Sequence, residues 1–588
     1  MSSSLFDRIL SSSINVKHRL ESLLNICRIY KHPSWLSDDS CDEFYRFYGP
    51  DLSDIQELED SIVSISVLIE HLQHERNSTE TCEPFPNYPL CKNGWTLKDI
   101  EQIEKEQVLN LNILNLINLH SFNACNNELD KQQCLKSELD NTHIISNDRR
   151  HLNTRSLSTI PNSCLSCTTN KNLLDLPIEL LLHIFSFISP FELITNLAPT
   201  CRYFANLVLN HVYTHIDLYK AASVFDVTRL LSYLTCLRTI AFINWDNEVS
   251  ILAWAIWFDR ISKATSNLHT IRFQNVYISP ILICFIVEYF PHCLQSIIFD
   301  YQQVKSYERF DLILSLLADK TIQLKHITAS YQTGITNFGI LQLVNNLNMV
   351  VELNLLYIEA INDETVKILC DKHNTYLEIL KIDGAQLTDK ALEYIDCCRK
   401  LKSFMIEFCT NMIGSNFYIF QNFDNLKELC LSKLTNASLE SFQLLFDGKH
   451  IFRNLALLKL GECHSIDDNC VRSIITMCPR LIDFMCSWAY SLTDDSFNEI
   501  VMRCQHLRRL SLVGCHQIYG RILDYVPEKY FHHIEYLNFE QCNQIEDELL
   551  IKLYKRKKSI SIINYYGTSV DDDDDDDHDD DEDDLKSF

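Results

Sequence analysis

The sequence predicts an α/β fold in which one strand and one helix form a unit, and the units stack into a curved solenoid. The first observation is a six-residue frame of the L-x-x-L-x-L type, which recurs thirteen times at spacings of 24 to 31 residues. The second is that helix-period segments follow the frames, as at 389–395 and 468–475. Units this small cannot bury their own apolar side chains, so stacking must provide a shared core. We expect parallel strands inside and helices outside, preceded by a small, mostly helical module and a three-helix unit.

Residues 1–123 are the predicted helical module. From Val16 to Tyr30 the apolar residues recur on one helical face, and the segment from Ile55 to Leu72 repeats the pattern. The same end of the chain contains several histidines, so we considered a di-iron helical bundle. Such a site needs histidine and carboxylate side chains at i, i+3 or i, i+4 on facing helices. Spacing of that kind is limited to His18 with Glu21 and His71 with Glu75. We therefore expect solvated helix faces and no bound metal.

Residues 124–173 are expected to be a polar linker, because apolar periodicity stops there and turn-forming residues accumulate. Cys164 and Cys167 form a C-x-x-C pair within it. A structural zinc site needs a second pair of ligands at a suitable spacing, and nothing near this pair offers one. We expect two ordinary cysteines there.

Residues 174–218 are expected to form three short helices. Pro177 suits a first helical turn, and the acid Glu179 lies near the positive end of the helix dipole. Leu180, Ile184 and Phe187 then form one apolar stripe, and a second stripe lies one residue round the helix. A unit of about 45 residues cannot bury so wide an apolar face. The surplus predicts a permanent partner or packing on the next domain.

The same segment resembles the F-box. The matches, in order, are Leu176-Pro177, Glu179, Leu180-Leu181, Ile184-Phe185, Phe187, Glu192-Leu193 and Thr200-Cys201-Arg202-Tyr203-Phe204. The resemblance implies docking onto the Skp adaptor of an SCF-type (Skp, cullin, F-box) ubiquitin ligase, so the expected partners include that adaptor and the cullin. Adaptor binding is predicted through Leu176, Pro177, Leu180, Leu181, Ile184, Phe185, Ile188 and Leu193.

The thirteen frames carry a second pattern. They begin at residues 237, 268, 294, 324, 350, 377, 401, 426, 455, 481, 507, 534 and 560. Eight residues after the frame start, four of them place a cysteine, at Cys409, Cys463, Cys515 and Cys542. This pattern resembles the cysteine-containing subclass of leucine-rich repeats. A catalytic cysteine would be a single thiol beside a histidine base, whereas a thiol repeated along a solenoid is expected to be packed structure.

The inner strand face is the predicted substrate-binding surface. Within each frame the second, third and fifth residues are expected to point away from the core, because strand side chains alternate faces. Large aromatic and arginine side chains on such a surface are typical of binding hot spots. Substrate binding is therefore predicted at Trp488, Tyr490, Arg508, Arg509 and Tyr536. The adjacent arginines beside Trp488 suggest a pocket for an acidic or phosphorylated segment.

Composition excludes several functional classes. The 588 residues carry a net charge of −27, and 13 acids lie within 571–584, which disfavours nucleic acid as the main ligand. Neither a cationic and apolar leader nor a run of ~18 apolar residues is found, so we expect no membrane association and a cytoplasmic and/or nuclear protein. Its 24 cysteines are then expected to be reduced. We find no P-loop, dinucleotide fingerprint or nucleophile elbow, and expect no catalytic residue, metal or cofactor.

The predicted order of domains is a helical module at 1–123, a linker at 124–173, an F-box at 174–218, repeats at 225–566 and a disordered acidic tail at 567–588. Over 174–566 this order resembles the F-box and leucine-rich-repeat proteins. The resemblance implies a non-catalytic receptor that presents a bound substrate protein for ubiquitination and proteasomal degradation. The alternative is a repeat-based interaction scaffold that is not linked to ubiquitin.

Overall fold

The protein is described from a computed structural model. It covers residues 5–30, 52–77 and 176–570, except for short segments within the last range. These segments are 186–187, 189–196, 198–199, 209–210, 212–213, 220–223, 232–233, 246–248, 301–309, 319–322, 333, 526 and 528–529. The predicted linker with Cys164 and Cys167, the middle helix of the F-box and residues 571–588 of the predicted tail lie outside the described residues. Residues 567–570, which were assigned to the disordered tail, are ordered: Val570 is buried and its N–H donates to Ile562 O at 2.9 Å.

The strands form one parallel sheet in which spatial order follows sequence order. They are β1 (His215–Tyr219), β2 (Thr239–Ile243), β3 (Thr270–Gln274), β4 (Ser296–Phe299), β5 (His326–Thr328), β6 (Glu352–Leu355), β7 (Ile379–Asp383), β8 (Ser403–Glu407), β9 (Glu428–Ser432), β10 (Leu457–Gly461), β11 (Asp483–Cys486), β12 (Arg509–Ser511), β13 (Tyr536–Asn538) and β14 (Ser561–Ile563). Every predicted frame contains one of them, and the predicted fold class is confirmed. Residues 215–218, assigned to the F-box from the sequence, form most of a further strand, β1.

Helices alternate with these strands. They are α1 (Leu5–Tyr30), α3 (Leu52–Asn77), α7 (Ile178–Phe185), α9 (Arg202–Leu207), α10 (Val224–Leu231), α11 (Ile251–Ala264), α12 (Pro280–Tyr289), α13 (Asp311–Leu317), α14 (Asn337–Asn346), α15 (Asp363–His373), α16 (Asp389–Ile395), the 3-10 helix η8 (Phe417–Asn422), α17 (Leu439–Leu445), α18 (Asp468–Met477), α19 (Asp494–Arg503), α20 (Ile522–Tyr525) and α21 (Asp547–Arg556). None of the helices in the described part of the chain is long and apolar enough to cross a membrane.

The described residues form two compact units. The first contains α7, α9, strands β1 to β3 and the parts of α1 and α3 outside residues 19–61. In this unit Trp254 and Trp257 of α11 pack on Phe242 of β2, with ring centroids 4.9 and 6.1 Å away. The Arg8 guanidinium of α1 lies 3.1 Å from the carboxylate of Asp259, which is buried. The ion pair therefore fixes α1 on α11.

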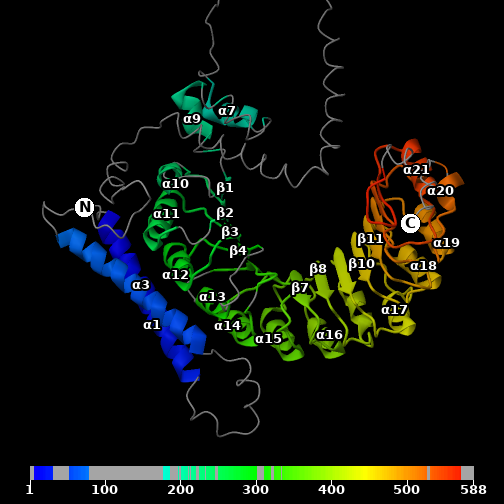
Figure 1. Ribbon diagram of the computed structural model, residues 1–588, viewed down its shortest axis with the longest axis horizontal. Helices are drawn as coiled ribbons and strands as arrows, with labels where there is room; N and C mark the ends of the chain where they lie inside the picture. Colours follow the sequence, from blue (N-terminus) through cyan, green and yellow to red (C-terminus); the bar gives the residue numbers. More distant parts are fainter. Residues whose placement is uncertain are drawn as a thin grey trace, which may run out of the picture. The chain divides into compact units, whose positions relative to one another are not determined.

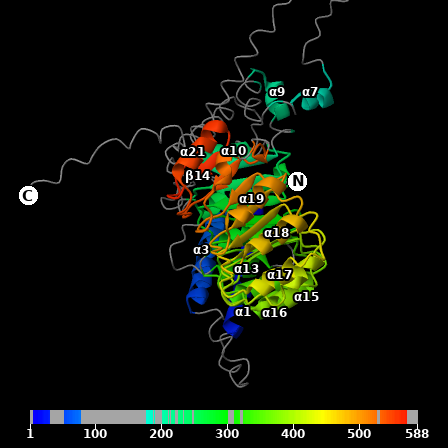
Figure 2. The ribbon, with the colours of Figure 1, turned by 90° about the vertical axis from the view of Figure 1, so that its right-hand side faces the viewer.

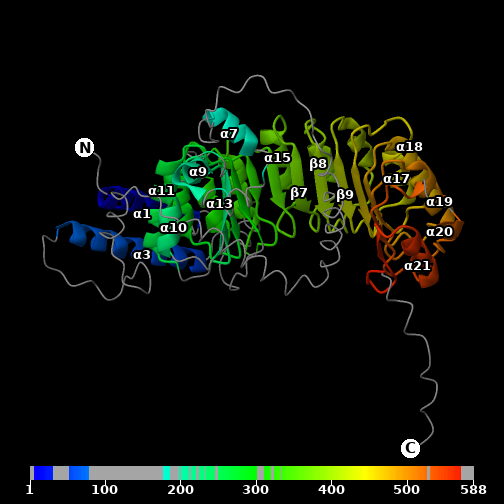
Figure 3. The ribbon, with the colours of Figure 1, turned by 90° about the horizontal axis from the view of Figure 1, so that it is seen from above.

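The second unit contains strands β4 to β14 and most of their helices. Strands β7 to β11 line the inner side of an arc, and helices α15 to α19 follow one another along its outer side (Figures 1 and 2). From above, β7, β8 and β9 lie side by side (Figure 3). In the frames that start at 294 to 534, the first, fourth and sixth residues fill the layer between strands and helices, as Leu377, Leu380 and Ile382 do. This is the stacked core that the frame predicted. The frame at 560 is one residue out of register, because Ile562 is buried and pairs with Leu537.

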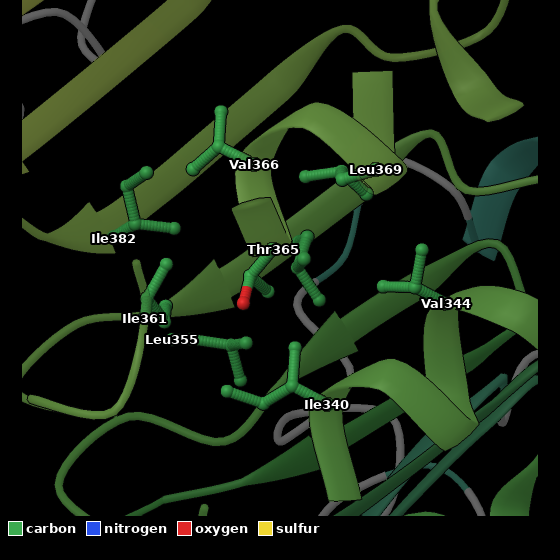
Figure 4. Close-up of a pocket in the computed structure, with 9 residues that line it drawn as sticks. Ile340, Val344, Leu355, Ile361, Thr365, Val366, Leu369 and Ile382 are labelled. Atoms are coloured by element: carbon green, nitrogen blue, oxygen red, sulfur yellow. The ribbon is translucent and has the colours of Figure 1, made fainter. Parts of the chain in front are cut away.

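The core of the second unit is closely packed. Between α14, α15 and strands β6 and β7 lies a void of about 10 Å³, lined by aliphatic side chains and Thr365 (Figure 4). The Thr365 hydroxyl is 2.7 Å from Asn337 Oδ1, so its polar group is satisfied. A space of this size is at the lower limit for one water. It therefore offers no room for a substrate.

Most of the described repeats end their strand in the same turn. A residue one to three places after the strand has a positive φ, for example 64° at Tyr357, 56° at Lys433 and 57° at Trp488. This conformation aims its N–H at the next unit: Lys433 N–H donates to Gly461 O at 2.7 Å, and Trp488 N–H to Val513 O at 2.7 Å. The turn therefore extends the sheet hydrogen bonding by one more bond.

The four repeated cysteines follow this turn, and their predicted burial is confirmed. Cys409, Cys463, Cys515 and Cys542 are all buried. Their thiols lie against backbone carbonyls; the Cys542 Sγ, for example, is 2.9 Å from Leu512 O in the preceding repeat. Burial raises the pKa of Cys542 to about 11 and that of Cys515 to about 12, so both thiols stay protonated at neutral pH.

The N-terminal helices are longer than the sequence predicted. Helix α1 begins at Leu5 rather than near Val16, and its additional turns bury Ile9 and Leu10. The amphipathic pattern weakens there because Ser11 to Ser13 interrupt it. Among the described residues no cluster of three His, Cys, Asp or Glu side chains is suited to hold a metal ion.

Candidate functional site

Helix α7 begins as its sequence predicts. Pro177 precedes the first turn, and its carbonyl accepts hydrogen bonds from the N–H groups of Leu180 and Leu181, each at 3.1 Å. Glu179 lies in the first turn, where its negative charge suits the helix dipole. Eight residues of helix therefore present two apolar stripes in different directions.

The two stripes of α7 have different environments. Leu181 and Phe185 are buried, and the Phe185 ring meets the Phe204 ring of α9 edge to face, with centroids 5.8 Å apart. Leu180 and Ile184 are 50% and 39% exposed. One stripe therefore holds α7 against α9, and the other leaves an apolar surface in solvent.

The structure divides the predicted adaptor-binding residues into three groups. Pro177, Leu180 and Ile184 are exposed, while Leu176 and Ile188 are half-buried. Leu181 and Phe185 face the interior instead, so a partner could meet them only if α7 moved away from α9. Leu193 lies outside the described residues.

Thr200 does not cap helix α9. Its hydroxyl donates to Leu197 O at 2.6 Å, and the cap position of α9 is taken by Cys201, which makes no side-chain cap bond. The apolar side of this helix faces the interior, because Phe204, Leu207 and Val208 are buried.

The predicted substrate-binding residues come from three consecutive repeats around β11, β12 and β13. Trp488 follows β11 in the positive-φ turn, and its indole packs against Gly514, the equivalent residue of the next repeat. Tyr490 is exposed and stacks between His464, at 4.9 Å, and His516, at 5.8 Å, with interplanar angles of 11° and 14°. The His464, Tyr490 and His516 rings, from three consecutive repeats, therefore form one stack, here called the Tyr490 stack.

The two histidines of the Tyr490 stack were not predicted as site residues from the sequence. His464 and His516 each follow a repeated cysteine directly, and Tyr490 follows the equivalent Ala489. His464 also fixes the turn, since its Nδ1 lies 2.9 Å from Trp488 O. Aligning the residue after each cysteine across the frames would have found all three rings.

The two arginines beside the Tyr490 stack form ion pairs within the chain. Arg508 lies 3.2 Å from the carboxylate of Glu535, and Arg509 lies 3.6 Å from that of Asp483. The Arg509 guanidinium also covers the Tyr536 ring at 5.1 Å. Pairs this exposed are each worth only ~0–1 kcal/mol. An incoming anion would therefore compete with two carboxylates, which weakens the predicted preference for an acidic segment.

Comparison with known proteins adds a family match for one segment. The model of the F-box-like family matches residues 173–219. The structure is similar to the one described as the crystal structure of the Rad7 and Elc1 complex in yeast, with 14% identity, a TM-score of 0.46, and coverage of 66% of this chain and 91% of that chain. Similarity to the TLR13–ssRNA13 complex is lower, with 14% identity, a TM-score of 0.30 and coverage of 56% and 46%. No curated protein sequence matches. The chain thus contains an F-box-like domain beside its repeat solenoid.

Proposed function

We propose that this protein is the substrate-recognition subunit of an SCF-type ubiquitin ligase. It docks on the Skp adaptor, and through it on the cullin, by its F-box. The observation that carries the proposal is the outward face of α7, where Leu180 and Ile184 remain exposed although the opposite stripe already fills the interior. Exposed apolar faces of this kind mark interaction surfaces. The F-box-like match over 173–219 supports the Skp adaptor as the partner.

The repeats hold the substrate in this proposal. They have the strand and helix alternation, the frame and the buried cysteines of leucine-rich repeats of the cysteine-containing subclass. Such a subunit performs no chemistry itself; it holds a substrate protein near the ubiquitin-transferring enzyme until the substrate is modified and degraded. The Tyr490 stack, with the neighbouring Trp488, supplies exposed aromatic surface for such contacts. The place of action is the cytoplasm, the nucleus or both.

The double variant Leu180→Glu with Ile184→Glu tests the adaptor surface. Both side chains are exposed, so the helix is expected to fold, while two central apolar contacts are replaced by charges, each costing about 2 kcal/mol or more at an interface hot spot. The expected result is loss of the Skp adaptor and the cullin from affinity-purified protein, measured by quantitative mass spectrometry.

The matched control is Leu444→Glu, which introduces a charge at another exposed leucine, on α17. It is expected to leave adaptor binding unchanged. Adaptor and cullin recovery that is equal for the double variant and the wild type would contradict the proposal. The protein would then be an interaction scaffold not linked to ubiquitin.

A further inference from the structure

One turn position carries exposed aromatic rings that the fold does not require. The turn position after the strand has positive φ in most of the described repeats, a conformation that favours Gly and Asn and is uncommon for bulky residues. Other repeats place Lys433, Glu462, Gly514 and Gln541 there. Tyr331, Tyr357 and Phe408 occupy it at φ 61°, 64° and 59°. The backbone therefore tolerates rings at these places but gains nothing from them.

These three residues, here called the aromatic ladder, form a continuous strip. The Tyr331 and Tyr357 rings stack with centroids 4.0 Å apart and an angle of 20°, and Phe408 meets Tyr357 edge to face at 5.6 Å. Gly384 occupies the position between Tyr357 and Phe408, where a Cβ would lie 2.9 Å from Glu407 O. Because that repeat has no side chain, the rings on either side can touch. Tyr331 and Tyr357 remain 50% and 37% exposed.

Carboxylates accompany the ladder without a cation to balance them. Asp383 of β7 and Glu407 of β8 are direct partners in the sheet register, an arrangement of like charges that disfavours the fold. Asp383 is buried and its Oδ1 accepts a hydrogen bond from the Ala385 N–H at 2.8 Å, so Glu407 is the carboxylate of this pair that a ligand can reach. Burial, with the nearby charges of Glu359 and Glu407, raises the pKa of Asp383. Among the described residues no ion pair involves Glu359, Asp383 or Glu407. Hydrogen bonding to Tyr331, burial and Glu407 together raise the pKa of Tyr357, so its hydroxyl stays protonated beside the acids.

The chain itself shows which chemistry suits this surface. The Lys433 ammonium lies 4.6 Å from the centre of the Phe408 ring, next to the ladder, and 3.8 Å from the carboxylate of Glu462. A cation on an aromatic face beside a carboxylate is a favourable arrangement, and it strengthens as water is excluded. The remaining rings and carboxylates of the ladder have the same composition but no cation.

We propose that the aromatic ladder, with Glu359 and Glu407, binds a basic, lysine- or arginine-rich segment of the substrate protein. The proposal rests on the proposed function and names the substrate chemistry that the solenoid recognises. Charge complementarity selects this occupant: aliphatic groups of a long basic side chain cover the rings, while its cation lies against the accessible carboxylates of Glu359 and Glu407. An acidic or phosphorylated segment would meet repulsion at the same place.

Fluorescence anisotropy with the full chain tests this. The probe is a fluorescein-labelled peptide of four Gly-Arg-Ser repeats, with four Gly-Glu-Ser repeats as the opposite charge, at physiological salt. The double variant Tyr331→Asn with Tyr357→Asn keeps residues that accept positive φ and is expected to weaken binding of the basic peptide about tenfold. Glu407→Gln is expected to weaken it several-fold while leaving the melting temperature unchanged or higher, because the like-charge pair is relieved. The acidic peptide is expected not to bind.

Two controls separate the ladder from general charge attraction. Glu535→Gln removes a carboxylate elsewhere on the strand face, and a full-length variant with asparagine at each aspartate of 571–584 neutralises the tail. Both are expected to retain the wild-type affinity for the basic peptide. Equal affinity of the wild type and both ladder variants would overturn the proposal, as would an equal loss in either control.

The proposed function is tested separately on the same variants. The ladder lies outside the F-box, so its variants are expected to retain the adaptor and cullin. If the wild type binds the basic peptide through the ladder but recovers no adaptor, the proposed ligase role fails while the ladder site stands. If adaptor recovery is intact and the ladder variants bind the peptide as the wild type does, the ladder proposal alone fails.

Discussion

At the scale of single residues, Gly514 leaves the space that Trp488 occupies. It has a φ of 68°, and an added Cβ would lie 2.6 Å from carbon atoms of the indole. Gly514→Ala is therefore expected to cost ~1–2 kcal/mol for the left-handed conformation and ~1–3 kcal/mol more for the clash. The indole should move outward, which a red-shifted tryptophan emission and a lowered melting temperature would detect.

Gly448→Ala is the matched control for that substitution. Gly448 has a φ of 83°, and nothing lies within 4 Å of the position that its Cβ would take. It therefore measures the conformational cost alone. Equal losses of stability in the two variants, with unchanged emission, would show that the indole does not depend on the glycine.

The residue scale also shows how far the sequence could describe the site. Alternation along the strand correctly placed Arg508 and Arg509 on the surface. Their partners Glu535 and Asp483 belong to neighbouring repeats. Which residues pair therefore depends on the sheet register, and the sequence of a single frame does not determine that register. For α7 the residue pattern predicted two apolar stripes of similar composition. Packing against Phe204 decides which stripe is inside, and that contact is made by another helix.

At the scale of elements, an aspartate at a helix start joins consecutive repeats. The Asp468 carboxylate of α18 accepts hydrogen bonds from the N–H and hydroxyl of Thr493, at 2.9 and 2.7 Å, and from the Ser496 hydroxyl. Thr493 is the N-cap of α19. The same two hydrogen bonds from a threonine N–H and hydroxyl recur between Thr388 and the Asp363 carboxylate. One side chain thus fixes the start of the next helix.

The variant Asp468→Ala tests whether the start of α19 depends on this aspartate. It leaves the Thr493 N–H without its acceptor, at a cost of ~1–3 kcal/mol. Because a chain with two units need not unfold in one step, the sensitive measurement is local. Hydrogen–deuterium exchange is expected to become faster in peptides that cover the turn before α19.

Asp495→Ala is the control for helix charge. Asp495 also lies in the first turn of α19, but its carboxylate is exposed and spans no repeat boundary. Exchange at the turn before α19 is expected to stay slow in this variant. Unchanged exchange at that turn in Asp468→Ala would show that stacking of the apolar core alone sets the helix start.

Element boundaries were predictable where the local signals agreed. Helix α16 spans Asp389–Ile395, as its apolar period and first-turn acid predicted. The start of α1 was missed because its first turns owe their order to Arg8 and Asp259, which are 251 residues apart in sequence. Long-range pairing of this kind leaves no periodic trace in either segment.

At the scale of the whole molecule, charge is distributed unevenly along the chain. Removing residues 571–588 would leave a net charge of −15 from the total of −27. Charges on exposed segments are screened over about 8 Å at physiological ionic strength but act over ~30 Å at 0.01 M salt. The tail is therefore expected to attract basic partners mainly at low salt. The aromatic ladder is expected to bind them mainly through direct contact, which depends less on salt.

Deleting 571–588 separates these two contributions. Adaptor recovery is expected to remain unchanged, because the deleted residues follow the last strand and lie outside the F-box-like segment. The affinity for the Gly-Arg-Ser peptide at physiological salt is also expected to stay within about twofold, whereas at 0.01 M salt the full chain is expected to bind more tightly than the truncated one. Anisotropy titrations at both salt concentrations measure the difference. Loss of the adaptor on truncation would show instead that the tail supports the folded chain, and an equal loss of peptide affinity at both salt concentrations would assign the peptide to the tail rather than to Tyr331 and Tyr357.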